Sequence, residues 1–104
     1  MTNKDILNFI VRYAADERKL GRGRNERVFF KRSNTIWACK EMYSQIKSNP
    51  QVPAKKTIER FAATMEEYAC RANKKFASAY AFSIASDTAN DILDSIDIYE
   101  RIKL

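Results

Sequence analysis

Apolar side chains recur every three or four residues along most of this chain, which is the spacing of one face of an α-helix. The first such segment runs from about Asn3 to Leu20, with Thr2 or Asn3 as the N-cap and Gly21 as a left-handed end. Its apolar face is made of Ile6, Leu7, Phe9, Ile10, Tyr13, Ala14 and Leu20. Polar and charged residues occupy the opposite face, so the pattern predicts an amphipathic helix.

A second helical segment begins after Asn25, which is a candidate N-cap. Its apolar stripe consists of Val28, Thr35, Ile36, Cys39, Met42, Tyr43 and Ile46. Phe30 and Trp37 lie outside this stripe and, being seven residues apart, share a second face of the helix. Either the two rings are buried against the first or third helix, or they are exposed anchors for a protein partner. With apolar residues on two sides, this helix is expected to be central.

Two prolines, Pro50 and Pro53, separate the second segment from a third helix. The apolar face of the third helix carries Ile58, Phe61, Ala62, Met65, Tyr68, Ala69, Ala72 and Phe76. An Ala- and Ser-rich stretch follows, and Ser86 or Asp87 is expected to cap a final helix. The core stripe of that helix consists of Ala85, Ala89, Ile92, Leu93, Ile96 and Tyr99. These segments predict an all-α fold, an antiparallel bundle of four to five helices in a single domain, residues 1–104.

One residue type and two sequence motifs that many enzymes rely on are absent from the chain. There is no histidine, which removes the commonest general base at neutral pH and the usual nitrogen ligand for zinc. Gly21-Arg22-Gly23 lacks the further glycine of a dinucleotide site, and the chain contains no phosphate-loop motif. Cys39 and Cys70 are expected to be reduced thiols. We therefore expect no enzymatic activity and no cofactor.

Charge is distributed unevenly along the chain, whose net charge is +6. The first thirty-two residues hold nine bases and four acids, whereas the last nineteen hold five acids and two bases. In the final helix Asp87, Asp91 and Asp94 share one face, with Asp97 beside it. Their spacing does not match a calcium-binding loop, so we predict no metal site. The four acids form either a solvated helix face or a surface for a basic protein partner.

Basic residues gather around the turn between the first two helices. They are Arg18, Lys19, Arg22, Arg24, Arg27, Lys31 and Arg32. Arginine binds phosphate or carboxylate groups, and Phe29, Phe30 and Trp37 could stack on the bases of a single strand. The pattern predicts a site for nucleic acid or an acidic partner, or else a charged connector that keeps a helical hairpin soluble. Glu17 and Arg32, each on an apolar face, are expected to pair with each other.

The segment from Tyr80 to Asp94 combines an Ala-Phe-Ser-x-Ala run with an acidic Asp-Ile-Leu-Asp helix. In this last third of the chain it resembles small uncharacterised proteins of bacteriophages and prophages. The resemblance implies a mobile-element origin and a stoichiometric binder that blocks a host machine, as inhibitors of nucleic-acid-guided defence nucleases do. Many of those inhibitors imitate DNA with an acidic surface, whereas this chain is basic overall and has only its last helix to offer as a mimic.

The function expected from these features is that of a non-enzymatic phage accessory protein that binds and occludes a host nucleic-acid-handling complex, in the manner of an anti-CRISPR inhibitor. One alternative is a small basic nucleic-acid-binding regulator whose acidic helix forms a dimer contact. Another is an assembly component of a virion or a replication complex. The expected partner is a host protein or ribonucleoprotein, with nucleic acid as the alternative. The chain has neither a membrane-spanning stretch nor a leader pattern, so we expect it to act in the bacterial cytoplasm.

Overall fold

Four helices make up most of the residues that the structure describes. The computed structural model describes residues 1–19, 26–72 and 77–102. The helices are α1 (Asn3–Lys19), α2 (Glu26–Ser48), α3 (Ala54–Arg71) and α4 (Ala77–Ile102), and no strand occurs within the described ranges. The all-α prediction is therefore confirmed. The expected cap at Asn25, the end at Gly21 and the apolar residues Leu20 and Phe76 lie outside the described residues.

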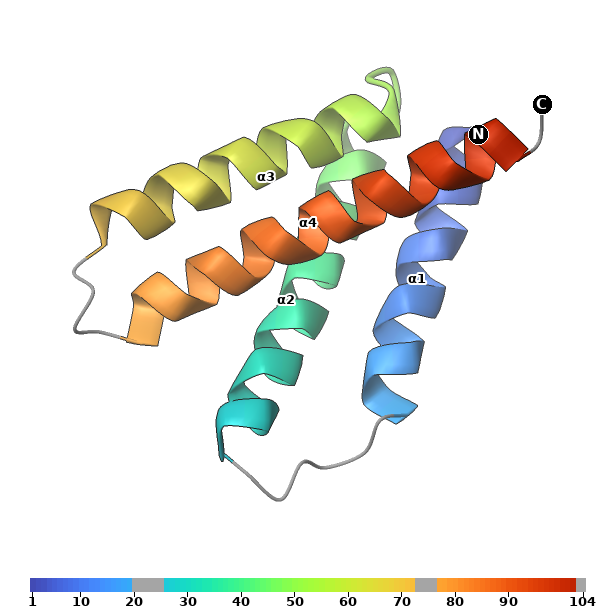
Figure 1. Ribbon diagram of the computed structural model, residues 1–104. Helices are drawn as coiled ribbons and strands as arrows, with labels where there is room; N and C mark the ends of the chain where they lie inside the picture. The colour runs from blue at the N-terminus through green and yellow to red at the C-terminus, as the bar shows by residue number, and fades with distance from the viewer. Residues whose placement is uncertain (20–25, 73–76, 103–104) are drawn as a thin grey trace.

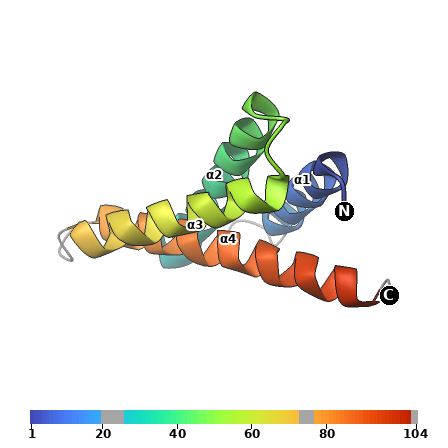
Figure 2. The same ribbon diagram turned by 90° about the horizontal axis from the view of Figure 1, so that it is seen from above.

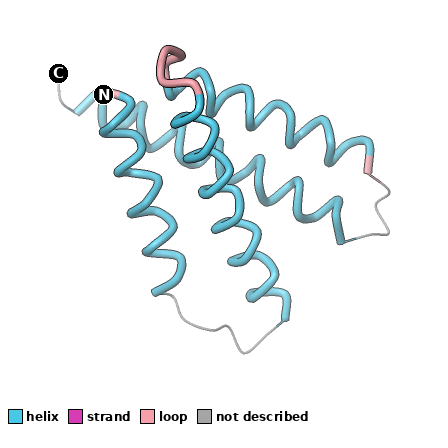
Figure 3. Tube along the Cα trace, turned by 180° about the vertical axis from the view of Figure 1, so that it is seen from behind, coloured by secondary structure: helices cyan, strands magenta, loops and turns pink. Residues whose placement is uncertain are grey.

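The helices form two antiparallel hairpins, α1–α2 and α3–α4, that cross each other steeply (Figure 1, Figure 2). α4 lies alongside α3 and also packs on α2, so that one hairpin covers the other. α2 contacts all three other helices, as expected for a helix with apolar residues on two sides. Seen from behind, the connection between α2 and α3 lies near the start of α1 (Figure 3). The antiparallel pairing predicted from the sequence thus holds within each hairpin.

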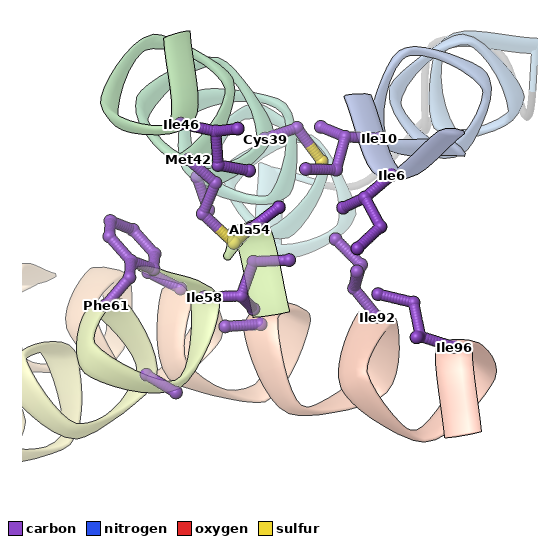
Figure 4. Packing of buried hydrophobic residues seen from close by; sticks show 14 of the residues in the cluster. Ile6, Ile10, Cys39, Met42, Ile46, Ala54, Ile58, Phe61, Ile92 and Ile96 are labelled. Atoms are coloured by element: carbon purple, nitrogen blue, oxygen red, sulfur yellow. The ribbon is translucent and has the colours of Figure 1, made fainter. Parts of the chain in front are cut away.

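The hydrophobic core lies where the two hairpins cross. Figure 4 shows side chains from all four helices pointing into one cluster. Its members include Ile6, Ile10, Cys39, Met42, Ile46, Ile58, Phe61, Ile92 and Ile96. Ala38, Ala85 and Ala89 are also fully buried, and their small side chains let the helix backbones approach closely. The apolar stripes predicted from the sequence supply most of this core.

The start of α4 differs from the prediction. The expected cap at Ser86 or Asp87 is wrong, because α4 is continuous from Ala77 and Ser86 is buried within it. The Ser86 hydroxyl instead donates a hydrogen bond to the Ala62 carbonyl oxygen of α3 at 3.1 Å. Serine favours a cap when its hydroxyl bonds to the local backbone, and here the neighbouring helix supplies the acceptor.

Two tyrosines that were expected in the core are exposed. The exposed fraction is 45% for Tyr68 and 47% for Tyr99. The Tyr68 ring packs edge-on against Phe82 of α4, with the ring centroids 5.4 Å apart. Figure 1 shows that the C-terminal half of α3 projects beyond α2, so that, among the described helices, only α4 lies along this part of its stripe. Helical periodicity identifies a face but does not show where the neighbouring helices end.

The start of α1 is capped as the sequence predicts. The Asp5 N–H donates to the Thr2 hydroxyl oxygen at 3.2 Å, and the Thr2 N–H donates to the Asp5 carboxylate at 3.0 Å. Such a reciprocal pair is a capping box, which satisfies backbone donors that the first turn of a helix leaves without partners.

Asn3 joins the start of α1 to the connection between α2 and α3. Its side-chain amide donates to the carbonyl oxygens of Pro50 at 3.2 Å and Val52 at 3.1 Å. Its Oδ1 atom accepts the Ala54 N–H at 2.8 Å, and Ala54 is the first residue of α3. Pro53 has no side-chain oxygen with which to cap this helix, so a residue of α1 does so instead.

We expect the substitution Asn3→Ala to lower the free energy of unfolding by about 1–3 kcal/mol, because it leaves the α3 N-terminus and two carbonyl groups without their partner. Urea denaturation followed by circular dichroism measures the change. The matched control is Asn8→Ala, which removes an exposed amide of the same helix and is expected to cost less than about 0.5 kcal/mol. Equal losses for the two variants would contradict this role of Asn3.

Candidate functional site: a polar groove between α1, α2 and α4

A polar groove of about 320 Å³ lies between α1, α2 and α4. It is lined by Tyr13, Glu17, Lys31, Thr35, Ile84, Asp87, Thr88, Asn90 and Asp91. α2 and α4 meet at Thr35 and Thr88, two buried residues whose hydroxyl oxygens lie 3.5 Å apart. The groove is therefore created by the crossing of the two hairpins and requires both of them.

Each of the three helices contributes a pair of residues that are one turn apart. The pairs are Tyr13 and Glu17, Lys31 and Thr35, and Asp87 and Asp91. Residues four positions apart lie on the same face of a helix, so each pair is presented to the groove together. The Thr88 hydroxyl donates to the Ile84 carbonyl oxygen at 2.8 Å, which satisfies this buried polar group within α4.

Negative charge predominates in the groove, which holds three carboxylates and one ammonium group. Burial, followed by the negative charges of Asp91 and Glu17, raises the pKa of Tyr13 to about 12. The phenol is therefore a neutral hydrogen-bond donor at neutral pH. The ion pairs of the described residues do not include Glu17, Asp87 or Asp91. These three carboxylates can accept hydrogen bonds from a cationic group of another molecule.

The four acids selected from the sequence have different surroundings. Asp87 and Asp91 line the groove, whereas Asp94 is exposed outside it. Asp97 forms an ion pair with Lys55 of α3 at 2.6 Å. The hydrogen bond from Lys55 to Asp97 is the main cause that raises the pKa of Lys55 above its ordinary value. Asp97 thus links α4 to the start of α3 through an ion pair. Only two of the four acids, Asp87 and Asp91, line the groove.

The structure places only part of the basic cluster. Arg18 and Lys19 are exposed at the end of α1, and Lys31 is exposed at the polar groove. Arg22 and Arg24 lie outside the described residues. Lys31 of the basic cluster therefore lies in the same groove as Asp87 and Asp91 of α4.

Arg27 belongs to the first turn of α2, but its side chain is outside the described part of the structure. The expected pair between Glu17 and Arg32 is absent from the ion pairs of the described residues. Glu17 lines the groove instead, and Arg32 is half-buried with an Nη1 atom that has no hydrogen-bond partner. Apolar patterns place both residues on inward faces, but they do not fix the register between two helices.

The aromatic side chains of α2 are exposed to different degrees. Trp37 is 41% exposed and its ring packs against Phe61 of α3, with the centroids 6.4 Å apart. Phe30 is half-buried, and its carbonyl oxygen accepts a hydrogen bond from the Asn34 side chain at 2.9 Å. Phe29 is the most exposed of the three at 61%. Phe30 is thus partly buried and Trp37 partly covered by Phe61, and their role as anchors for a protein partner stays a prediction.

Sequence reasoning missed several residues of the groove. Tyr13 was assigned to the core stripe, and Thr35 to the stripe of the second helix. Asn90 carried no signal beyond its polarity. The only available sign was the spacing of four residues between polar groups on each helix, and such pairs also occur on ordinary solvated faces. The position of the helix crossing was needed to bring them together.

Cation binding by hydrogen bonds and charge is the chemistry that this groove favours, because carboxylates bind guanidinium and ammonium groups strongly. Within the described residues there is no group of three His, Cys, Asp or Glu side chains that could hold a metal ion. Cys39 is a buried free thiol and Cys70 an exposed one.

Among the described helices, none is long and apolar enough to cross a bilayer. No family model, curated protein or solved structure matches this chain.

Proposed function

We propose that this protein is a non-enzymatic binding protein of phage or mobile-element origin that occludes a host nucleic-acid-handling complex in the bacterial cytoplasm, as an anti-CRISPR-like inhibitor. One observation carries the proposal: Glu17, Asp87 and Asp91 line an open groove and take part in none of the ion pairs of the described residues. Proteins that handle nucleic acids bind the phosphates through arginine and lysine side chains. Carboxylates held in a groove can occupy those cations in place of phosphates.

Exposed aromatic residues support a protein partner. Phe29 and Trp37 present large apolar surfaces on α2, the helix that also supplies Lys31 and Thr35 to the groove. Aromatic side chains are frequent hot spots of protein interfaces, where they fill pockets of the partner. A bare nucleic-acid backbone, in contrast, would be repelled by the groove carboxylates.

Capture from lysates of bacteria that encode nucleic-acid-guided defence nucleases tests the proposal. We expect the double substitution Asp87→Lys and Asp91→Lys to weaken the captured complex at least about tenfold, because it replaces the attraction for a basic surface by repulsion. Glu66→Lys, which reverses an exposed charge on α3, is the matched control and is expected to retain the complex. Nuclease treatment of the lysate is expected to leave capture unchanged. Retention by the double variant, or loss after nuclease treatment, would contradict the proposal.

A nucleic-acid-binding regulator is the second candidate function. It is favoured by the exposure of Arg18 and Lys19 beside a strongly basic segment. In this case the affinity for DNA falls steeply with salt, because bound phosphates release counterions. The triple substitution Arg22→Glu, Arg24→Glu and Arg27→Glu would abolish it, whereas reversal of the groove carboxylates would leave it intact or strengthen it.

A further inference from the structure

A second pocket, of about 230 Å³, lies between α1 and α2 and shares no lining residue with the polar groove. Its apolar walls come from Ile10, Val11, Ala14 and Tyr43. Cys39 also lines it, and Figure 4 shows that Cys39 and Ile10 face each other between the two helices. Ile10, Ala14 and Cys39 are buried, whereas Val11 is 53% exposed at the rim. The pocket is therefore an apolar depression that opens to solvent beside Val11.

The size of this pocket suits one side chain. A cavity of about 150 Å³ holds a benzene ring, whereas sites for drug-sized molecules usually exceed about 300 Å³. The floor is uncharged at neutral pH, because burial, assisted by the negative charge of Glu17, raises the pKa of Cys39 to about 12. An aromatic or branched aliphatic group would thus meet only apolar or neutral atoms inside.

Positive charge surrounds the opening. Arg18 and Lys40 line the pocket, both are exposed, and the ion pairs of the described residues include neither of them. Arg18 opposes the rise in the pKa of Cys39, whereas the negative charge of Glu17, which lines the polar groove, acts on the same thiol more strongly. The positive charge of this pocket therefore lies at its rim and not inside it. Lys47 lies over the ring of Tyr43, with its Nζ atom 5.4 Å from the ring centroid. An occupant that carries negative charge next to its apolar group would complement this rim.

We propose that the pocket binds one large apolar side chain of the partner protein at a position flanked by aspartate or glutamate. The inference rests on the proposed function only in taking the partner to be a protein. Apolar anchors in small pockets account for much of the affinity of protein interfaces, and charges at the rim select the partner. This contact lies apart from the polar groove. The acidic groove would meet a basic patch of the partner, and the basic rim of the pocket would meet an acidic patch of the same partner.

Three blocked tripeptides test this pocket directly: acetyl-Asp-Trp-Asp-amide, acetyl-Asp-Ala-Asp-amide and acetyl-Lys-Trp-Lys-amide. Nuclear magnetic resonance of the full chain follows the methyl groups of Ile10, Val11 and Ala14 during each titration. We expect the acidic tryptophan peptide to shift these signals and to bind at least about tenfold more tightly than the other two. Equal binding of the alanine peptide, or tighter binding of the lysine peptide, would overturn the proposal. Tighter binding of a deoxythymidine decamer at the same methyl groups would assign the pocket to nucleic acid.

Charge reversal at the rim provides the decisive variant. Arg18→Glu combined with Lys40→Glu changes two exposed residues, and we expect it to invert the preference in favour of the lysine peptide. Lys56→Glu combined with Arg60→Glu makes the same change in charge on α3 and is expected to leave all three affinities unchanged. An unchanged preference in the first variant would refute the role of the rim. Because purified peptides are used, failure here is distinct from failure of the groove, which capture with the Asp87 and Asp91 variant tests separately.

Discussion

Replacing Phe61 by alanine is expected to lower the free energy of unfolding by about 3–5 kcal/mol, which is the range for large-to-small substitutions in a core. Phe61 is only 3% exposed and lies in the cluster where the two hairpins cross. Its ring also packs against Trp37, so truncation leaves a cavity and uncovers one side of the indole. The loss therefore combines burial, packing and an aromatic contact.

Urea denaturation measures this loss by circular dichroism and, independently, by fluorescence of Trp37, the single tryptophan of the chain. The matched control on the same helix is Glu66→Ala, an exposed position at which we expect a change within about 0.5 kcal/mol. Met65→Ala, also in the core, is expected to cost about 2–5 kcal/mol. Similar losses at Phe61 and Glu66 would show that the assigned inward face of α3 is wrong.

Alkaline pH is expected to destabilise the fold strongly. The folded state raises the pKa of Cys39 from 9.0 to about 12, chiefly by burial, and that of Tyr13 from 10.0 to about 12 by burial and the nearby carboxylates. Above pH 9 the unfolded chain loses these protons first, so the native state binds more protons. The stabilisation is complete below pH 9 and is lost as the pH rises towards about 12.

The dependence of unfolding free energy on pH isolates the contribution of the thiol. Cys39→Ala removes one of the two groups, so its stability is expected to fall less steeply above pH 9 than that of the wild type. The slopes of unfolding free energy against pH are compared, and not the free energies themselves, because the packing lost in Cys39→Ala lowers stability at every pH. Identical slopes for wild type and Cys39→Ala would refute the shifted pKa of Cys39.

The helical fold could be predicted from the sequence because apolar residues recur with the helical period and only two glycines and two prolines interrupt the chain. The inward positions of Ile10, Met42 and Ile92 follow from this period. The continuity of α4 through Ser86 could not be predicted, since the acceptor for its hydroxyl belongs to another helix. The same holds for Asn3, whose three hydrogen bonds reach residues about fifty positions away.

The polar groove was predictable only in pieces. Asp87, Asp91 and Lys31 were selected for their charge, but they were assigned to two separate surfaces. Their approach depends on the crossing of α2 and α4 at Thr35 and Thr88, and a single sequence contains no direct record of where two helices cross. The apolar pocket beneath Val11 was missed for the same reason, because its walls belong to two different helices.

The crossed arrangement has a consequence for cooperativity. Ile6 lies in the first hairpin and Ile92 in the second, yet both point into one shared cluster (Figure 4). Each hairpin therefore lacks an independent core, and separated fragments would leave their apolar stripes in water. The chain is expected to unfold in a single all-or-none transition, and complementary fragments cut between α2 and α3 would gain helical structure only on mixing.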